Sequence, residues 1–250
     1  MVILHTAAQI AAMRKAGQLV AKTFAHLMPL VVPGVSTHAL DSAAEQFIRA
    51  NGATPAYKGY LGFPATICVA PNSVICHGIP SPTSILHDGD IIGLDIGVIL
   101  DGWYGDACIT LPVGTISTAA QALLNVTAEC LRRGIAVATV GNTLGDIGAA
   151  IQQHAEAHGY GVVREYTGHG VGQRLHQEPT VHHVGKAGSG LALKEGMIFT
   201  IEPMINAGTH KAILDKKDKW TVRTADGNLS AQFEHTIAIT ATGAQILTLP

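Results

Sequence analysis

Residues 91–111, IIGLDIGVILDGWYGDACITL, decide the fold of this chain because they are typical of a long β-hairpin. Two β-prone runs flank Asp101-Gly102, a dipeptide that favours a two-residue turn. Such a turn places Asp95 opposite Cys108, with Asp106 two residues from Cys108 on the same face. We therefore expect the carboxylates of Asp95 and Asp106 to be diagonal neighbours on one side of the hairpin.

Both carboxylates lie in strongly apolar strands, where an unpaired buried charge is costly and a bound cation removes the difficulty. Three further residues have similar settings: His169 in GHGVG, Glu202 in TIEP and Glu234 in FEHT. Four carboxylates with one imidazole suit two divalent metals better than one. Metals about 3.5–4 Å apart need bridging carboxylates and activate water for hydrolysis. The sequence therefore predicts a metal-dependent hydrolase.

The rest of the chain alternates helical and β-prone segments. Hydrophobic periodicity and capping residues predict helices over 6–30, 36–52, 117–137 and 143–159. Strands are expected near 161–166, 197–206, 219–223 and 232–240, and residues 57–80 form a Gly/Pro-rich stretch with short β-prone runs.

A weak internal repeat relates residues 34–52 to residues 141–159 at a constant offset. Two capped helices that end in glycine could coincide by chance. The alternative is a duplicated helix-plus-strand unit, in which the first half supplies Asp95 and Asp106 and the second supplies the other three candidate ligands. In that case the metal pair lies at the seam of two pseudo-symmetric halves.

Composition excludes several classes of protein. The 250 residues are 47% hydrophobic and 14% charged. The net charge is −2, so no excess of positive charge indicates DNA binding. The four cysteines form no C-x-x-C pair. The N-terminus, MVILHTAAQI, lacks the basic segment of a signal peptide, and no apolar run is long enough to span a membrane. We expect a cytoplasmic protein.

Seven motifs in order, CHGIP, LDIG, YGDA, GHGVG, LHQEP, FTIEP and QFEHT, resemble those of type I, bacterial-like methionine aminopeptidases. The resemblance covers essentially the whole chain. It implies an α+β pita-bread fold, in which two pseudo-symmetric αβ halves surround a central antiparallel sheet. Residues 1–250 would form one catalytic domain, with halves of roughly 1–112 and 113–250.

The resemblance also assigns the metal site. It implies that Asp106 and Glu234 bridge two divalent ions (Co, Mn, Fe or Zn), that Asp95 chelates one ion, and that His169 and Glu202 hold the other. Metal-activated water would attack the scissile carbonyl of an N-terminal methionine, with a small second residue preferred. Glu202 would transfer the proton, and the catalytic histidines His77 and His176 would contact the substrate.

The methionine pocket follows less directly from the same resemblance, which implies a lining of Tyr60, Phe63, Cys68, Leu175 and Trp220. Leu61, Phe63 and Leu175 depart from residues common in the family. These departures leave open a relaxed-specificity aminopeptidase. An X-Pro aminopeptidase of the same fold and a non-catalytic pita-bread binding protein compete with these two interpretations.

The lysine-rich segment 210–220 is interpreted as a solvated loop, with ribosome contact during methionine excision from nascent chains as the alternative. The resemblance implies a monomer, and the charge and hydropathy described above predict no DNA or membrane partner.

Overall fold

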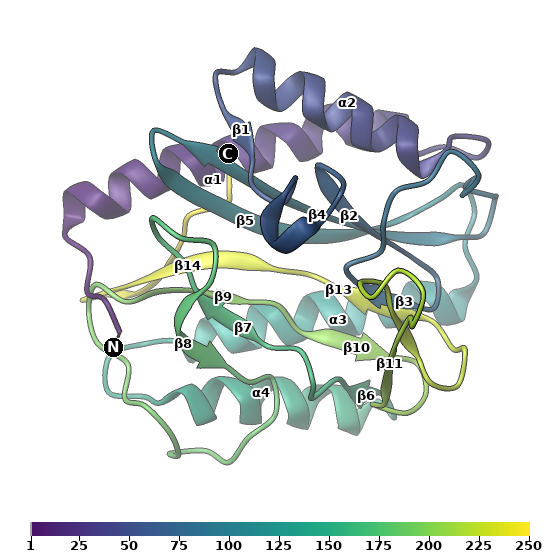
Figure 1. Ribbon diagram of the computed structural model, residues 1–250. Coiled ribbons are helices and arrows are strands. Elements are labelled where there is room, and N and C mark those ends of the chain that lie inside the picture. Colours follow the sequence, from purple (N-terminus) through teal and green to yellow (C-terminus); the bar gives the residue numbers. More distant parts are fainter. Residues whose placement is uncertain (1) are drawn as a thin grey trace.

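The computed structural model describes residues 2–250 and has helices on both outer faces of a layered β-structure (Figure 1). In the first half, helices α1 (Ala7–Leu27) and α2 (Thr37–Ala50) cover a sheet whose central strand pairs with three neighbours. Its strands are β1 (Thr54–Pro55), β2 (Ile67–Pro71), β4 (Ile91–Leu100) and β5 (Trp103–Pro112). One of the two largest buried apolar clusters lies between these helices and this sheet.

In the second half, helices α3 (Thr118–Ala136) and α4 (Leu144–Ala157) cover the opposite face and enclose the other large apolar cluster. A five-stranded sheet has the order β15-β14-β9-β7-β8, with β7 (Gly168–Gly170), β8 (Gln177–Val181), β9 (Ile198–Ile201), β14 (His235–Thr240) and β15 (Gly243–Ile246). Two three-stranded sheets complete the fold. One has β13 (Ser230–Gln232), β10 (Met204–Asn206) and β6 (Gly161–Val162); in the other, β11 (Ala212–Leu214) and β12 (Val222–Thr224) of the second half pair with β3 (Val74–Cys76) of the first.

The hairpin has the predicted register. Leu100 pairs with Trp103 across a two-residue turn, Asp95 pairs with Cys108, and Gly97 pairs with Asp106. The two carboxylates therefore lie on one face as diagonal neighbours, as expected. All the paired strands are antiparallel.

Strand β5 joins the two halves. The backbone N–H of Glu234 donates to the carbonyl of Cys108 at 2.8 Å, and the Thr236 hydroxyl donates to the carbonyl of Asp106 at 2.7 Å. Farther along, the Thr110 hydroxyl donates to the Gln232 carbonyl at 2.7 Å. The two carboxylates of the hairpin consequently face the segments that carry the remaining candidate ligands.

The internal repeat extends beyond the two helices that suggested it. Helices α2 and α4 are both 14 residues long. Isolated bridges join Ser36 to Ile85 in the first half and Thr143 to Ala192 in the second, at the same offset as the helices. Strands β4 and β9 also begin at that offset, which makes Asp95 and Glu202 equivalent positions. This agreement favours duplication over chance.

Several strand predictions were wrong in their bounds. The segment 161–166 forms a strand only at Gly161–Val162, and 219–223 is replaced by Val222–Thr224. The segments 197–206 and 232–240 are each broken, at Glu202-Pro203 and Phe233-Glu234, because both segments leave the ladder where their carboxylates turn inward. The four helices were predicted to within about three residues at each end; helix 6–30 ends at Leu27 and continues as a 3-10 turn, Met28–Leu30.

Among residues 2–250, no helix combines the length and the apolar character that crossing a bilayer requires.

Candidate metal centre and active site

Asp95 and Asp106 project from the β4–β5 hairpin into a cavity of about 680 Å³. The Asp106 side chain is buried, and burial raises the pKa of its carboxyl to about 6. Burial, followed by the charge of Asp106, raises the pKa of Asp95 well above its ordinary value. Both groups are therefore harder to ionise than an ordinary aspartate in the absence of a cation.

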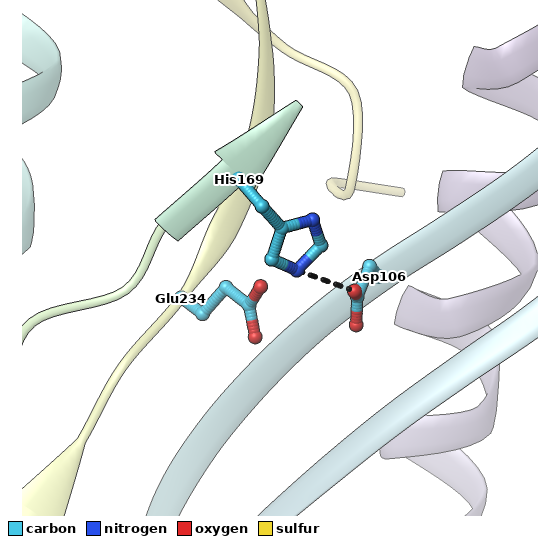
Figure 2. Close-up of side chains that lie close together, drawn as sticks. All are labelled: Asp106, His169 and Glu234. Carbon is cyan, nitrogen blue, oxygen red and sulfur yellow. Dashed lines mark ion pairs between the residues drawn. The ribbon is translucent and has the colours of Figure 1, made fainter. Parts of the chain in front are cut away.

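The second half brings His169, Glu202 and Glu234 to the same cavity. His169 lies on β7, and its Nε2 is 3.5 Å from Asp106 Oδ2 and 3.7 Å from Glu202 Oε1. Asp106, His169 and Glu234 offer ligand atoms that all lie within 4.8 Å of one another (Figure 2). Residues far apart in the sequence thus converge on one point, as the resemblance implied.

The interruption of the strands places the two glutamates. Ile201 pairs with His235 and Met204 pairs with Gln232, so the same register holds on both sides of the break. Glu202 and Glu234 occupy the gap between these pairs, and both are buried. The expectation that they lie within continuous strands was wrong. Leaving the ladder frees each residue to aim its carboxylate at the hairpin.

Hydrogen bonds orient the Glu202 carboxylate. The Thr200 hydroxyl donates to Oε1 at 2.7 Å, and the Gln232 amide donates to Oε2 at 3.3 Å. The Thr200 hydroxyl also accepts the backbone N–H of His169 at 2.9 Å, which links two candidate ligands. Burial raises the pKa of Glu202 well above its ordinary value, as it does for Glu234.

The His169 ring is set up as a neutral ligand. Burial lowers its pKa to about 4, so it carries no proton on one nitrogen at neutral pH. With Nδ1 donating to the Gly170 carbonyl at 3.1 Å, the lone pair of Nε2 faces the carboxylates.

The four carboxylates and the His169 imidazole fit a divalent metal ion. Burial raises the pKa values of all four carboxylates, and neighbouring carboxylates raise those of Asp95, Glu202 and Glu234 further, so the four ionise most readily when a cation shares the cavity. Carboxylate oxygens and a neutral imidazole are ligands that Mn, Fe, Co and Zn all accept.

The remaining residues predicted for the site also line this cavity. The Tyr60 hydroxyl is 2.8 Å from His176 Nδ1, and the rings of His169 and His176 have centroids 4.2 Å apart. His77 has a left-handed backbone, with φ of 55°, and its ring lies edge-on to Trp220. An apolar cluster lines another part of the same cavity and includes Phe63, Cys68, Leu175 and Trp220.

Sequence reasoning missed Tyr57. Its hydroxyl lies 2.5 Å from Asp95 Oδ1 and also hydrogen-bonds with Asp106 Oδ1. Burial, and then the neighbouring carboxylates, raise its pKa well above the ordinary value, which keeps the phenol a neutral donor. An aromatic residue in a Gly/Pro-rich stretch gives no signal that separates this position from ordinary core packing. Thr200 was also missed, because a threonine is common in β-strands and gives no signal that its hydroxyl bonds to a candidate ligand.

Segment 210–220 contains strand β11 as well as loop, so its interpretation as a loop was only partly correct. Its four lysines, Lys211, Lys216, Lys217 and Lys219, are exposed.

Comparisons with known proteins agree with this geometry. Residues 11–241 match the model of metallopeptidase family M24. The chain is 53% identical to methionine aminopeptidase A of Synechocystis sp., over 96% of this chain and 95% of that protein. A crystal structure of methionine aminopeptidase from Rickettsia prowazekii has a TM-score of 0.98 and 48% identity, with 100% coverage of both chains.

A prolidase from Pyrococcus furiosus has a TM-score of 0.81 and 23% identity, covering 99% of this chain and 66% of that one. This likeness shows the fold alone and confirms the pita-bread prediction. The chain therefore belongs to metallopeptidase family M24 and is a member of its methionine aminopeptidase group.

Proposed function

We propose that this enzyme removes the N-terminal methionine from peptides and nascent proteins, with preference for a small second residue. The observation that carries the proposal is the convergence of four carboxylates and a neutral imidazole beside an apolar cavity. Two divalent ions would be held by Asp95, Asp106, His169, Glu202 and Glu234, with cellular availability deciding among Co, Mn, Fe and Zn. When bound, they supply water of lowered pKa and polarise the scissile carbonyl.

Glu202 is suited to accept and return the proton in this reaction. Thr200 and Gln232 each donate to one of its oxygens, so the carboxylate has a fixed orientation. A carboxylate held in this way can take a proton from the attacking water and pass it to the leaving amine.

His176 and His77 are suited to bind the peptide group. If the Tyr60 hydroxyl donates to His176 Nδ1, then His176 Nε2 carries its hydrogen and can donate to the developing oxyanion. Burial lowers the pKa of His77 to about 4, so this ring is neutral at physiological pH. It can therefore hydrogen-bond to a peptide without adding charge to the cavity.

The apolar wall of the cavity suits a methionine side chain. The rings of Phe63 and Trp220 meet edge to face with centroids 5.1 Å apart, and Cys68 and Leu175 are buried beside them. Aromatic and sulfur-containing walls accommodate a flexible thioether, and sulfur–aromatic contacts add to its binding. Leu61 lies at the mouth of the same cavity, 81% exposed, where it can meet residues beyond the cleaved bond.

We further infer how the enzyme is organised and what it meets in the cell. One catalytic domain composed of two halves, working as a monomer in the cytoplasm, would meet nascent chains as they leave the ribosome. The exposed lysines of segment 210–220 offer a surface that ribosomal RNA could contact. An X-Pro aminopeptidase is not favoured, because the relatives with high identity are methionine aminopeptidases.

The test is hydrolysis of Met-Ala-Ser beside a panel of X-Ala-Ser and X-Pro peptides. Chelator-treated protein would be assayed before and after resupply with Mn or Co. We expect metal-dependent release of methionine alone, lost in Asp106→Asn. Asp101→Asn, on the exposed turn of the same hairpin, is the matched control and should retain activity. Release of other first residues would indicate relaxed specificity, and no turnover with any metal would refute the enzymatic function.

A further inference from the structure

The Tyr57 ring lies against Gly97, between the two carboxylates of the hairpin. An added Cβ at Gly97 would be 2.5 Å from Tyr57 Cε1 and 2.9 Å from its Cζ, so the ring lies directly on this glycine. Gly97 is two residues from Asp95 on one strand and is paired with Asp106 on the other. A ring seated on Gly97 is therefore flanked by both side chains.

The segment that carries Tyr57 is fixed to the hairpin by the backbone. Strand β1 pairs Pro55 with Val98, and the N–H of Ala56 donates to the carbonyl of Gly97 at 2.9 Å. Tyr57 itself is only 8% exposed, within the apolar cluster that includes Phe63, Cys68 and Leu175. The position of its hydroxyl is consequently set by packing on several sides.

That hydroxyl lies 2.5 Å from Asp95 Oδ1 and also contacts Asp106 Oδ1. Since a phenol has one hydrogen, it donates to one carboxylate at a time. Glu202 is oriented by two donors, whereas across residues 2–250 the structure shows no second side-chain hydrogen bond to Asp95. The orientation of Asp95 thus depends on Tyr57.

We propose that Tyr57 is a positioning residue whose hydroxyl holds Asp95 and Asp106 in the arrangement that receives divalent metal. This inference rests on the proposed function, because it takes the two aspartates to be metal ligands. Hydrogen bonds to metal ligands set ligand orientation, and their removal typically weakens metal binding about 10–100-fold.

The test is Tyr57→Phe, which removes the hydroxyl and keeps every atom of the ring. Mn(II) and Co(II) affinities of the full chain, freed of metal with a chelator, would be measured by titration calorimetry. We expect binding about 10–100-fold weaker than wild type and an altered visible absorption spectrum of the Co(II) form. Activity should return as the metal concentration is raised. Tyr160→Phe, a tyrosine packed against the distant α3–α4 cluster, is the matched control and should bind metal as the wild type does.

Two results would overturn the inference. Unchanged affinity and an unchanged Co(II) spectrum in Tyr57→Phe would leave Tyr57 as packing alone. Tighter binding would show that the hydroxyl competes with metal for the carboxylates. If the phenylalanine variant failed to fold, as judged by circular dichroism, Tyr57→Met would replace it, since it also lacks the hydroxyl and fills much of the same space. A wild type that neither bound metal nor cleaved Met-Ala-Ser would instead refute the proposed function, so the two failures are distinguishable.

Discussion

Metal binding to this protein should release protons, because the carboxylates of the site have raised pKa values in the metal-free fold. With a pKa of about 6, Asp106 is half protonated at pH 6 and so loses about half a proton when metal binds there. Asp95, Glu202 and Glu234 add to this, since their pKa values are raised well above ordinary carboxyl values. His169, with a pKa of about 4, is already neutral at pH 6 and contributes little.

Both the stability of the metal-free protein and its affinity for metal depend on pH through Asp106. Between its ordinary pKa and about 6, Asp106 binds a proton in the folded state that it lacks in the unfolded state, so its contribution to metal-free stability falls as pH rises. Metal competes with that proton. Asp106 alone should therefore increase metal affinity about tenfold between pH 5 and pH 7, equivalent to about 1.4 kcal/mol.

The assay is titration calorimetry with Mn(II) in buffers that differ in ionisation enthalpy, at pH 5, 6 and 7. The dependence of the observed enthalpy on the buffer gives the number of protons released. We expect more than about half a proton at pH 6, and fewer in Asp106→Asn. Asp101→Asn, on the exposed turn, should match the wild type. An enthalpy independent of buffer, or proton uptake, would refute the assignment of these carboxylates as protonated metal ligands.

Three further changes test individual contacts. Thr200→Val removes the hydroxyl that donates to Glu202, so Mn(II) affinity should fall about tenfold. It also leaves the backbone N–H of His169 without its acceptor, so the unfolding free energy should fall by about 1–3 kcal/mol. Unchanged metal affinity in calorimetry and unchanged denaturation would contradict this. Gly97→Ala places a methyl 2.5 Å from the Tyr57 ring, so denaturation should show a loss of about 1–3 kcal/mol together with weaker metal binding. Leu61→Ser changes an exposed side chain, so unfolding free energy should change by less than about 0.5 kcal/mol while KM for longer peptides rises; a large stability loss would place Leu61 in the core instead.

The proposed ligands were predicted from the sequence, but two of their local settings were not. Asp95 and Asp106 were placed correctly because turn length and strand alternation act over a few neighbouring residues. Glu202 and Glu234 were expected inside strands, and the structure instead breaks both strands at these residues. Both breaks lie where these strands face Asp95 and Asp106 across the cavity, and a local sequence pattern contains no information about that long-range contact.

The sequence by itself determined the hairpin register, the four helices and the set of candidate ligands. The register and the helices depend on interactions between residues close in the chain: turn propensity, helix capping and the alternation of buried and exposed positions. The set of candidate ligands follows instead from the chemistry of carboxylates and imidazole and from the family resemblance. Only the tertiary structure decided that Asp106, His169 and Glu234 share one point, and that Tyr57 lies between Asp95 and Asp106. The physical reason is that these contacts form when separate segments pack against one another, and an aromatic side chain in the core gives the same sequence signal whether or not its hydroxyl has a partner.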